Sequence, residues 1–127
     1  RRERGVANLQ NLRAIDDSAI NCTFPSPTFV RMINYINAAT GHDYDKKTFI
    51  TVGERINNIK RVISCNLGIT RQDDRLPKIV LNPLSSGRTA DIVINLDQNL
   101  ENYYKERAWD WETGRPTEEK LKELGIQ

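Results

Sequence analysis

One long amphipathic stretch, about residues 45–67, constrains the fold of this chain more than any other feature. Its apolar residues recur at steps of three and four, the spacing of one helix face: Phe49, Val52, Ile56, Ile59, Ile63 and Leu67. Asp45 can accept a backbone N–H at the start, and Gly68 can adopt the left-handed conformation that ends a helix. A helix of this length measures roughly 35 Å, about the width of a small domain, so we expect the shorter elements to pack against it.

Gly53 lies in the interior of this predicted helix, where glycine costs about 1 kcal/mol relative to alanine. The sequence leaves three explanations open. Another backbone packs closely against Gly53, a cofactor does so, or the glycine is tolerated at a surface position. The first two explanations would make Gly53 a contact point of the long helix.

Two shorter helices are predicted before the long one. The first spans about residues 4–16, and its apolar positions are Val6, Leu9, Leu12 and Ile15. The second has Ser26 as its N-cap and Pro27 as its first helical residue, and it ends at Gly41. Its expected buried face consists of Phe29, Met32, Ile33 and Ile36.

An irregular stretch with Pro77, Pro83 and Gly87 follows the long helix. It contains two candidate extended segments, residues 78–81 and 90–94, and two such segments would form at most a very small sheet. The chain then returns to helical sequence, so very short strands are the most that we expect.

Two further helices complete the chain. Asn95 or Asp97 caps one that runs through Arg107, with an inner side formed by Leu96, Leu100, Tyr103 and Tyr104. Thr117 caps the last, which has acidic residues in its first turn and stops at Gly125. We therefore predict a mostly α fold, a single helical domain over residues 1–127 organised around the long helix.

Composition and charge exclude several classes of protein. The formal net charge is +2, and no basic stripe with interleaved aromatic residues is present, which argues against nucleic acid as a partner. No apolar run approaches the ~18 residues that a membrane helix requires, and no signal-peptide pattern leads the chain. The chain starts without Met in charged, helix-like sequence, and we expect it to be a piece of a longer protein.

The cysteine and histidine counts limit the chemistry further. Cys22 and Cys65 are too few for a disulfide scaffold, and nothing indicates an oxidising compartment, so we expect a cytoplasmic protein. With His42 as its single histidine, the chain cannot by itself build a two-histidine zinc site, and no Ser-His-Asp arrangement stands out. We expect no complete active site in this chain.

The segment Asp17–Cys22 is the most informative place for chemistry. Cys22 follows a helix, has polar neighbours and precedes a proline break, an unusual position for a core residue. Thiolates hold iron–sulfur clusters, and such clusters take four of them, so further ligands would have to come from elsewhere. The carboxylate of Asp17 can accept two hydrogen bonds from an aminopyrimidine-like edge. The plainer alternative is a helix-end carboxylate and a small buried thiol.

This segment resembles the D-x-x-G-L-C element of the aldehyde:ferredoxin oxidoreductase family, the tungsten–pterin enzymes. Other elements of that family follow in the same order. Residues 40–56 contain stretches similar to its TGxD and GERI, and residues 71–77 to its R-x-D-D-x-L-P. Residues 103–110 resemble YYxxRGWD, and residues 114–125 resemble G-x-P-T-x-x-K-L-x-x-L-G. The resemblance covers nearly the whole chain.

The resemblance implies roles for three residues. Asp17 hydrogen-bonds a pyranopterin of a tungsten (or molybdenum) bis-pyranopterin, Asn21 lies against the pterin, and Cys22 is the fourth ligand of a [4Fe–4S] cluster. The other cluster cysteines, the first pterin-binding element and the acid/base residues lie upstream in the family. The resemblance therefore assigns no catalytic residue to this chain.

Two departures from the family pattern concern the substrate more than the fold. Ile20 stands where the family has Gly, and Asn21 where it has Leu. Residues 64–68 replace the family's N-V-R-E-G, so its Arg-Glu pair is absent at Asn66 and Leu67. Cys65 has no counterpart as a ligand and is interpreted as a buried structural thiol, and His42 as a packed or surface residue.

The resemblance implies the C-terminal domain of a tungsten–pterin [4Fe–4S] oxidoreductase, completed by the rest of the parent chain. Its expected reaction is oxidation of a small aldehyde to a carboxylic acid, with electrons passing to ferredoxin or an iron–sulfur partner subunit. The departures leave open the active-site subunit of a tungsten-dependent benzoyl-CoA reductase, which reduces an aromatic acyl-CoA. A non-catalytic helical interaction module is the alternative of another class, in which Asp17 and Cys22 serve no chemistry.

Overall fold

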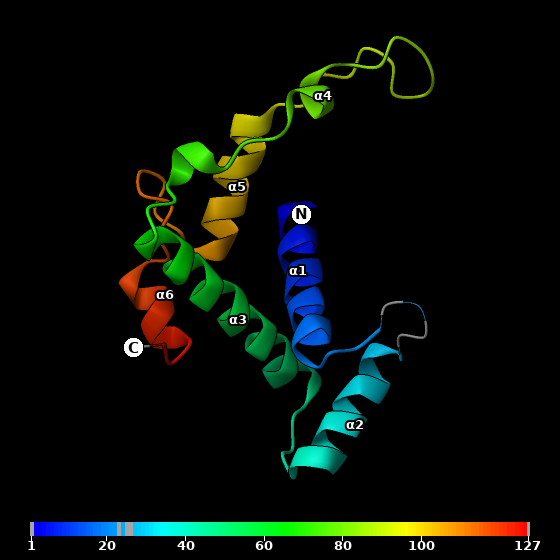
Figure 1. Ribbon diagram of the computed structural model, residues 1–127, viewed down its shortest axis with the longest axis vertical. Helices are drawn as coiled ribbons and strands as arrows, with labels where there is room; N and C mark the ends of the chain where they lie inside the picture. Colours follow the sequence, from blue (N-terminus) through cyan, green and yellow to red (C-terminus); the bar gives the residue numbers. More distant parts are fainter. Residues whose placement is uncertain (1, 23, 25–26, 127) are drawn as a thin grey trace.

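Helix α3 (Lys46–Asn66) runs through the centre of the computed structural model, which describes residues 2–22, 24 and 27–126 (Figure 1). Both predicted ends are confirmed. Asp45 accepts a hydrogen bond from the Thr48 N–H at 2.7 Å, and the Thr48 hydroxyl accepts one from the Asp45 N–H at 3.0 Å. This reciprocal capping box satisfies donors that the helix start leaves unpaired. Gly68, with φ of +96°, takes the left-handed turn after the helix.

Helix α1 (Arg2–Ser18) is longer than predicted and packs along α3 with a face of small and polar residues. The apolar residues that indicated this helix are not its buried face in the first half, because Val6 is half exposed and Leu9 is 68% exposed. The buried positions are Ala7, Asn11, Ala14 and Ile15. Small side chains allow the two helices to approach closely. The packing formed at this short distance stabilises the fold more than burial of Leu9 would.

Gly53 is the point of closest approach between these two helices. A Cβ atom on Gly53 would overlap the backbone carbonyl of Asn11. The first of the three explanations is therefore confirmed: another backbone packs against the glycine. Glycine lowers the stability of the helix itself, but any side chain at position 53 would push α1 away from α3.

The predicted apolar stripe of α3 is only partly buried. Phe49 lies in the core, but Ile59 and Ile63 are exposed, and Leu67 is 81% exposed. Asn58 and Arg61 occupy the buried face of this half of the helix instead. The pattern was misleading because the segments packed against this half present polar and aromatic groups.

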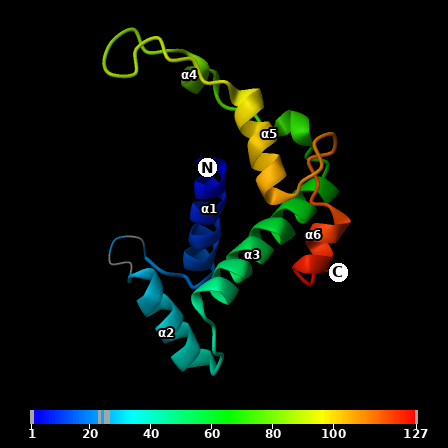
Figure 2. The same ribbon diagram turned by 180° about the vertical axis from the view of Figure 1, so that it is seen from behind.

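Helix α2 (Phe29–Thr40) packs beside the end of α1 and the start of α3 through its predicted face (Figure 2). The apolar cluster there contains Ile15, Met32, Ile33 and Phe49, with Phe29, Ile36 and Tyr44 packed against it. The predicted start is wrong, since Thr28 in extended conformation is the N-cap and Pro27 precedes the helix. Ser26, the predicted cap, lies outside the described residues. Gly41 ends the helix as predicted, with φ of +74°.

Residues 69–95 form an arm whose start contacts the helices and whose remainder extends away from them (Figures 1 and 2). A 3₁₀ turn (Arg71–Asp73) opens it, and residues 78–81, predicted as extended, form the single helical turn α4 (Lys78–Leu81). Residues 90–94 also form no strand, and Ala90 makes only an isolated bridge to Leu84. A strand needs a partner for its backbone groups, and neither segment meets one in the described part of the chain.

The last two helices agree with the prediction. Helix α5 (Leu96–Arg107) starts at the Asn95 cap, whose side chain accepts the Gln98 N–H at 3.1 Å, and it packs against α1. Helix α6 (Glu118–Glu123) starts at Thr117, which caps the Lys120 N–H at 3.2 Å. The fold is mostly α, with no strand among the described residues. No described helix has both the length and the apolar character to cross a membrane.

Candidate functional site

The motif residues of α3 fasten α6 to the rest of the molecule. Glu54 forms an ion pair with Lys120 at 3.1 Å, and the Arg55 Nε donates to the Leu124 carbonyl at 2.7 Å. Burial opposes the charge of Lys120, but its hydrogen bonds to Glu123 and Glu54 prevail and raise the pKa of the lysine. The GERI-like and K-L-x-x-L-G-like stretches therefore bind each other in the folded chain.

A buried polar network joins α3, α5 and the start of the arm. The Arg61 guanidinium is 9% exposed and donates to both carboxylate oxygens of Asp74, at 2.9 and 2.6 Å. It also donates to the Gly114 carbonyl at 2.6 Å and to the Tyr104 hydroxyl at 2.9 Å. The Tyr104 hydroxyl donates to Asp74 Oδ2. Each charge in this network has an opposite charge or a hydrogen-bonding group around it, which is the condition for burying it.

The surroundings of this network shift two pKa values. Burial raises the pKa of Tyr104 well above its ordinary value of 10.0, and the hydrogen bond to Asp74 adds to the effect. Burial alone would lower the pKa of Arg61, but the hydrogen bond to Asp74 and the charges around the guanidinium together outweigh it and the pKa rises. Tyr104 is therefore a neutral donor and Arg61 a permanent cation, roles that suit a structural network.

Aromatic side chains complete the same region. The Trp109 indole N–H donates to Asn58 at 2.9 Å, and the Arg61 guanidinium lies 4.7 Å from the centre of the Trp109 ring. Arg71 lies 4.1 Å from the centre of the Trp111 ring. Such cation–π contacts contribute about 0.5–2 kcal/mol each, depending on burial. The tyrosine pair and the tryptophans thus serve packing, and the sequence had placed the two tyrosines on the inner side of their helix.

Arg107 connects α5 to α1. It is 1% exposed, and its guanidinium donates to Asn11 Oδ1 at 2.6 Å, to Gln10 Oε1 at 2.8 Å and to the Ala7 carbonyl at 3.1 Å. Sequence reasoning missed both arginine networks, because it expected the buried faces of α3 and α5 to be apolar and aromatic. The available signal was the arginine of the YYxxRGWD-like stretch, which lies three and four residues after the two inner-side tyrosines and so on the same helix face.

The Asp17–Cys22 segment begins where α1 ends in a Schellman turn. The Asn21 N–H donates to the Asp16 carbonyl at 3.0 Å, and the Ile20 N–H donates to the Asp17 carbonyl at 3.2 Å. Ile20 has φ of +54°, the left-handed conformation that this turn requires and that glycine adopts without strain. The turn therefore explains why the family element has Gly at the position of Ile20. A β-branched residue there is a strained outlier.

Replacing Ile20 by glycine is expected to stabilise the protein by about 1 kcal/mol, because it removes the left-handed strain and the 93% exposed side chain contributes little packing. Thermal unfolding followed by circular dichroism measures the effect as a higher Tm. Ile79→Gly is the matched control, since Ile79 is also exposed but lies in the right-handed turn α4, so its replacement should lower the Tm. A lower Tm for Ile20→Gly as well would contradict the strain.

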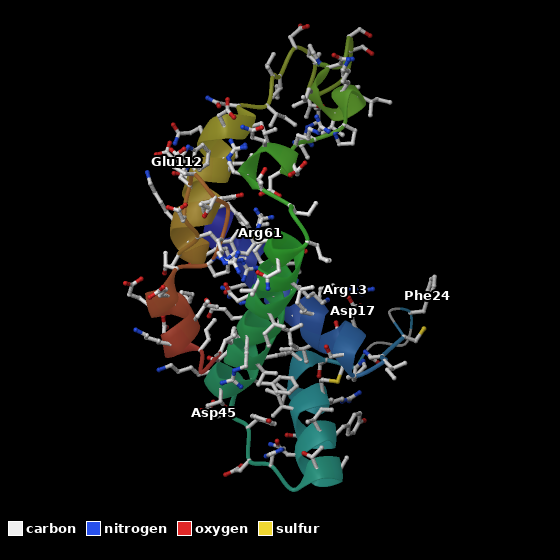
Figure 3. All side chains as sticks on the ribbon, turned by 60° about the vertical axis from the view of Figure 1, so that its left-hand side comes forward. Arg13, Asp17, Phe24, Asp45, Arg61 and Glu112 are labelled. Atoms are coloured by element: carbon white, nitrogen blue, oxygen red, sulfur yellow. The ribbon has the colours of Figure 1, made fainter. Side chains whose placement is uncertain are left out.

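The carboxylate of Asp17 lies at the rim of a groove between α1 and α3. Asp17 is half exposed, and its Oδ1 lies 3.1 Å from the Nε of Arg13, one turn earlier (Figure 3). The groove has a volume of about 330 Å³ and is also lined by Lys60 and Arg61. Its mixture of cations and one carboxylate suits a polar, hydrogen-bonding ligand better than an apolar one.

Asn21 and Cys22 do not line the groove that Asp17 lines. Asn21 lines a second hollow of about 530 Å³ between the end of α1 and α2, together with Arg31 and Tyr35. Cys22 is exposed. The structure brings the three expected site residues onto one turn of chain, but it does not direct them into a common pocket formed by the described residues.

The other residues singled out from the sequence are either partly buried or at the surface. Cys65 is half buried rather than fully buried, with its Sγ 3.8 Å from the Gly114 carbonyl. His42 is a surface residue whose ring centre lies 5.0 Å from that of Tyr44. Asn66 accepts a hydrogen bond from Arg115. None of these contacts points to a ligand.

The chemistry of the donor set fits a single-ligand role for Cys22. Its exposed thiol is accessible to a metal centre outside the helices. The described residues contain no group of three or more His, Cys, Asp or Glu side chains that could hold a metal ion. Any cluster held by Cys22 would therefore need ligands from outside the described residues.

Comparison with known proteins identifies the scaffold. Residues 1–126 match the sequence model of a family described as "Aldehyde ferredoxin oxidoreductase, domains 2 & 3". The chain belongs to the aldehyde ferredoxin oxidoreductase family. It is 39% identical over 128 residues to the tungsten-containing aldehyde ferredoxin oxidoreductase of Pyrococcus abyssi, and 37% identical over 126 residues to that of Pyrococcus horikoshii. These alignments cover 96% of the chain in each case.

The chain spans about a fifth of the length of the curated relatives that it matches. The same share applies to the tungsten-containing aldehyde ferredoxin oxidoreductase of Pyrococcus furiosus, which is 38% identical over 124 residues. The family membership confirms the resemblance stated from the sequence. The benzoyl-CoA reductase alternative receives no support from the relatives named here.

Proposed function

We propose that this chain is the C-terminal part of a multidomain tungsten–pterin oxidoreductase that converts an aldehyde to a carboxylic acid. One observation carries the proposal. The other family motifs form contacts within the chain, whereas the Asp17–Cys22 element presents an exposed carboxylate and an exposed thiol. An exposed thiol, and a half-exposed carboxylate whose ion pair with Arg13 lies within its own helix, are best explained by a cofactor outside the described fold, because the family element binds cofactors.

Each residue of the element has a distinct task in this proposal. Cys22 supplies one thiolate to a [4Fe–4S] cluster whose other ligands belong to the rest of the parent chain. Asp17 accepts hydrogen bonds from the aminopyrimidine edge of a pyranopterin, and Arg13 orients its carboxylate from 3.1 Å away. Asn21 lies against the pterin. When bound, the tungsten–pterin unit and the cluster supply the redox chemistry and pass electrons to ferredoxin or a partner subunit.

The scaffold contributes by fixing the position of this element. Helix α1 is held against α3 at Gly53 and against α5 by Arg107. Positioning of this kind matters because a cofactor site works only when its ligands are held by rigid support. The names of the relatives favour tungsten over molybdenum and an aldehyde over an aromatic acyl-CoA as the substrate.

Replacing Cys22 by serine in the parent enzyme is expected to abolish binding of the cluster, with a loss of about four iron atoms per chain. The reason is that serine keeps the size of the side chain but removes the thiolate. Iron and tungsten are measured by elemental analysis after purification without oxygen. Cys65→Ser is the matched control and should keep full iron, because Cys65 packs against Gly114.

Full iron content in the Cys22→Ser variant would rule out the cluster role. If the parent protein also lacks tungsten, iron and aldehyde oxidation while being folded, the interaction-module alternative replaces the proposal. In that case, changes at Asp17 and Cys22 should leave its activity unaffected.

A further inference from the structure

The two residues that flank Cys22 at a spacing of two are large, apolar and almost fully exposed. Ile20 is 93% exposed, and Phe24 is 100% exposed. The Phe24 side chain points away from the helices at the outer edge of the molecule (Figure 3). Single exposed apolar residues are ordinary, but these two lie two residues before and two residues after an exposed thiol in the chain.

The strain at Ile20 is a second, independent observation. A glycine would satisfy the left-handed turn at no cost, yet the chain has a β-branched side chain there with φ of +54°. Within the described residues this side chain packs against almost nothing, so no packing in the described fold offsets the free energy of the strain. Strained residues persist where the surroundings require them, and they concentrate at functional sites.

We propose that Ile20 and Phe24 form an apolar cover over the iron–sulfur cluster held by Cys22, and that this cover keeps the reduction potential of the cluster low. The inference rests on the proposed function, because it requires the cluster. Reduction adds one negative charge to the cluster, and a charge is less stable where water is excluded. Removing the cover admits water, stabilises the reduced state and makes the potential less negative.

The test uses the parent enzyme, purified without oxygen, with two variants that make the cover polar. Ile20→Thr keeps a β-branched side chain, so the backbone strain is unchanged and only polarity differs. Phe24→Ser removes the ring. The midpoint potential of the cluster is measured by redox titration with dithionite, followed by electron paramagnetic resonance. Both variants should keep full iron and shift the midpoint to a less negative value.

Two controls separate the cover from general effects. Phe24→Leu retains an apolar side chain and should keep the midpoint of the unmodified enzyme. Ile79→Thr makes the same chemical change at an exposed isoleucine of α4 and should also leave the midpoint unchanged. The coupling of solvent deuterons to the reduced cluster gives a second readout, and it should increase in Ile20→Thr and Phe24→Ser alone.

The outcomes distinguish this inference from the proposed function. Unchanged midpoints and deuteron couplings in Ile20→Thr and Phe24→Ser, at full iron, would overturn the apolar cover and leave the cluster role of Cys22 intact. Full iron in Cys22→Ser would overturn both. If Phe24→Ser loses iron, Ile20→Thr decides, because its smaller change at the same surface must still shift the midpoint.

Discussion

Gly53→Ala is expected to destabilise the protein by about 3 kcal/mol or more, although alanine is the better helix former by about 1 kcal/mol. The added methyl group would overlap the backbone carbonyl of Asn11, and a backbone cannot move aside as a flexible side chain can. Helix α1 must therefore shift away from α3, with loss of the packing at Ala7, Asn11 and Ala14. Urea unfolding followed by circular dichroism measures the change in the free energy of unfolding.

Gly5→Ala provides the matched control for this experiment. Gly5 lies in α1, and nothing lies within 4 Å of the position that its Cβ would occupy. This variant should be more stable than the unmodified protein by about 0.5–1 kcal/mol, since only helix propensity changes. Equal stabilisation by Gly53→Ala would show that α1 and α3 are not in close backbone contact.

Asp74→Ala is expected to destabilise the protein by about 3–5 kcal/mol, because it leaves the buried Arg61 guanidinium without its carboxylate. The Tyr104 hydroxyl loses its acceptor as well. The double variant Arg61→Met with Asp74→Ala should be more stable than Asp74→Ala alone, since it removes the unpaired charge. Urea unfolding of the two variants and of Arg61→Met completes a double-mutant cycle.

An exposed ion pair of the same protein is the comparison for Asp74. Asp97 lies 3.3 Å from Arg71 but is 88% exposed, so Asp97→Ala should cost less than about 1 kcal/mol. The contrast isolates burial, because both variants remove an aspartate bound to an arginine. A cost for Asp74→Ala no larger than that for Asp97→Ala would mean that the network around Arg61 does not stabilise the fold.

These predictions divide the family motifs into two kinds. The GERI-like, R-x-D-D-x-L-P-like and YYxxRGWD-like stretches supply Gly53, Asp74 and Arg107, which hold helices together. The Asp17–Cys22 element instead ends in exposed side chains. Damage to the first kind should unfold the scaffold, whereas damage to the second should remove a cofactor from a folded protein. Measuring unfolding and iron content on the same variants separates the two effects.

Local sequence determined the ends of most helices. Asp45, Asn95 and Thr117 cap the helices that follow them, and Gly41 and Gly68 turn left-handed after theirs. These features were predictable because a cap or a helix stop depends on groups only a few residues apart. The mostly α fold followed for the same reason. The order and spacing of the motifs also indicated the family, which the comparisons confirm.

Only the tertiary structure decided which helix faces are buried. Leu9 and Ile63 follow an apolar period and yet are exposed, whereas Asn11 and Arg61 are buried. The physical reason is that burial depends on partners distant in sequence. Gly53 has no side chain, so the small face of α1 can pack closely against it. Hydrogen bonds to Asp74 and Tyr104 offset the free-energy cost of burying Arg61. Likewise, the sequence indicated chemistry at Asp17, Asn21 and Cys22, but only the fold showed that Cys22 is exposed while Asp17 and Asn21 line two different hollows.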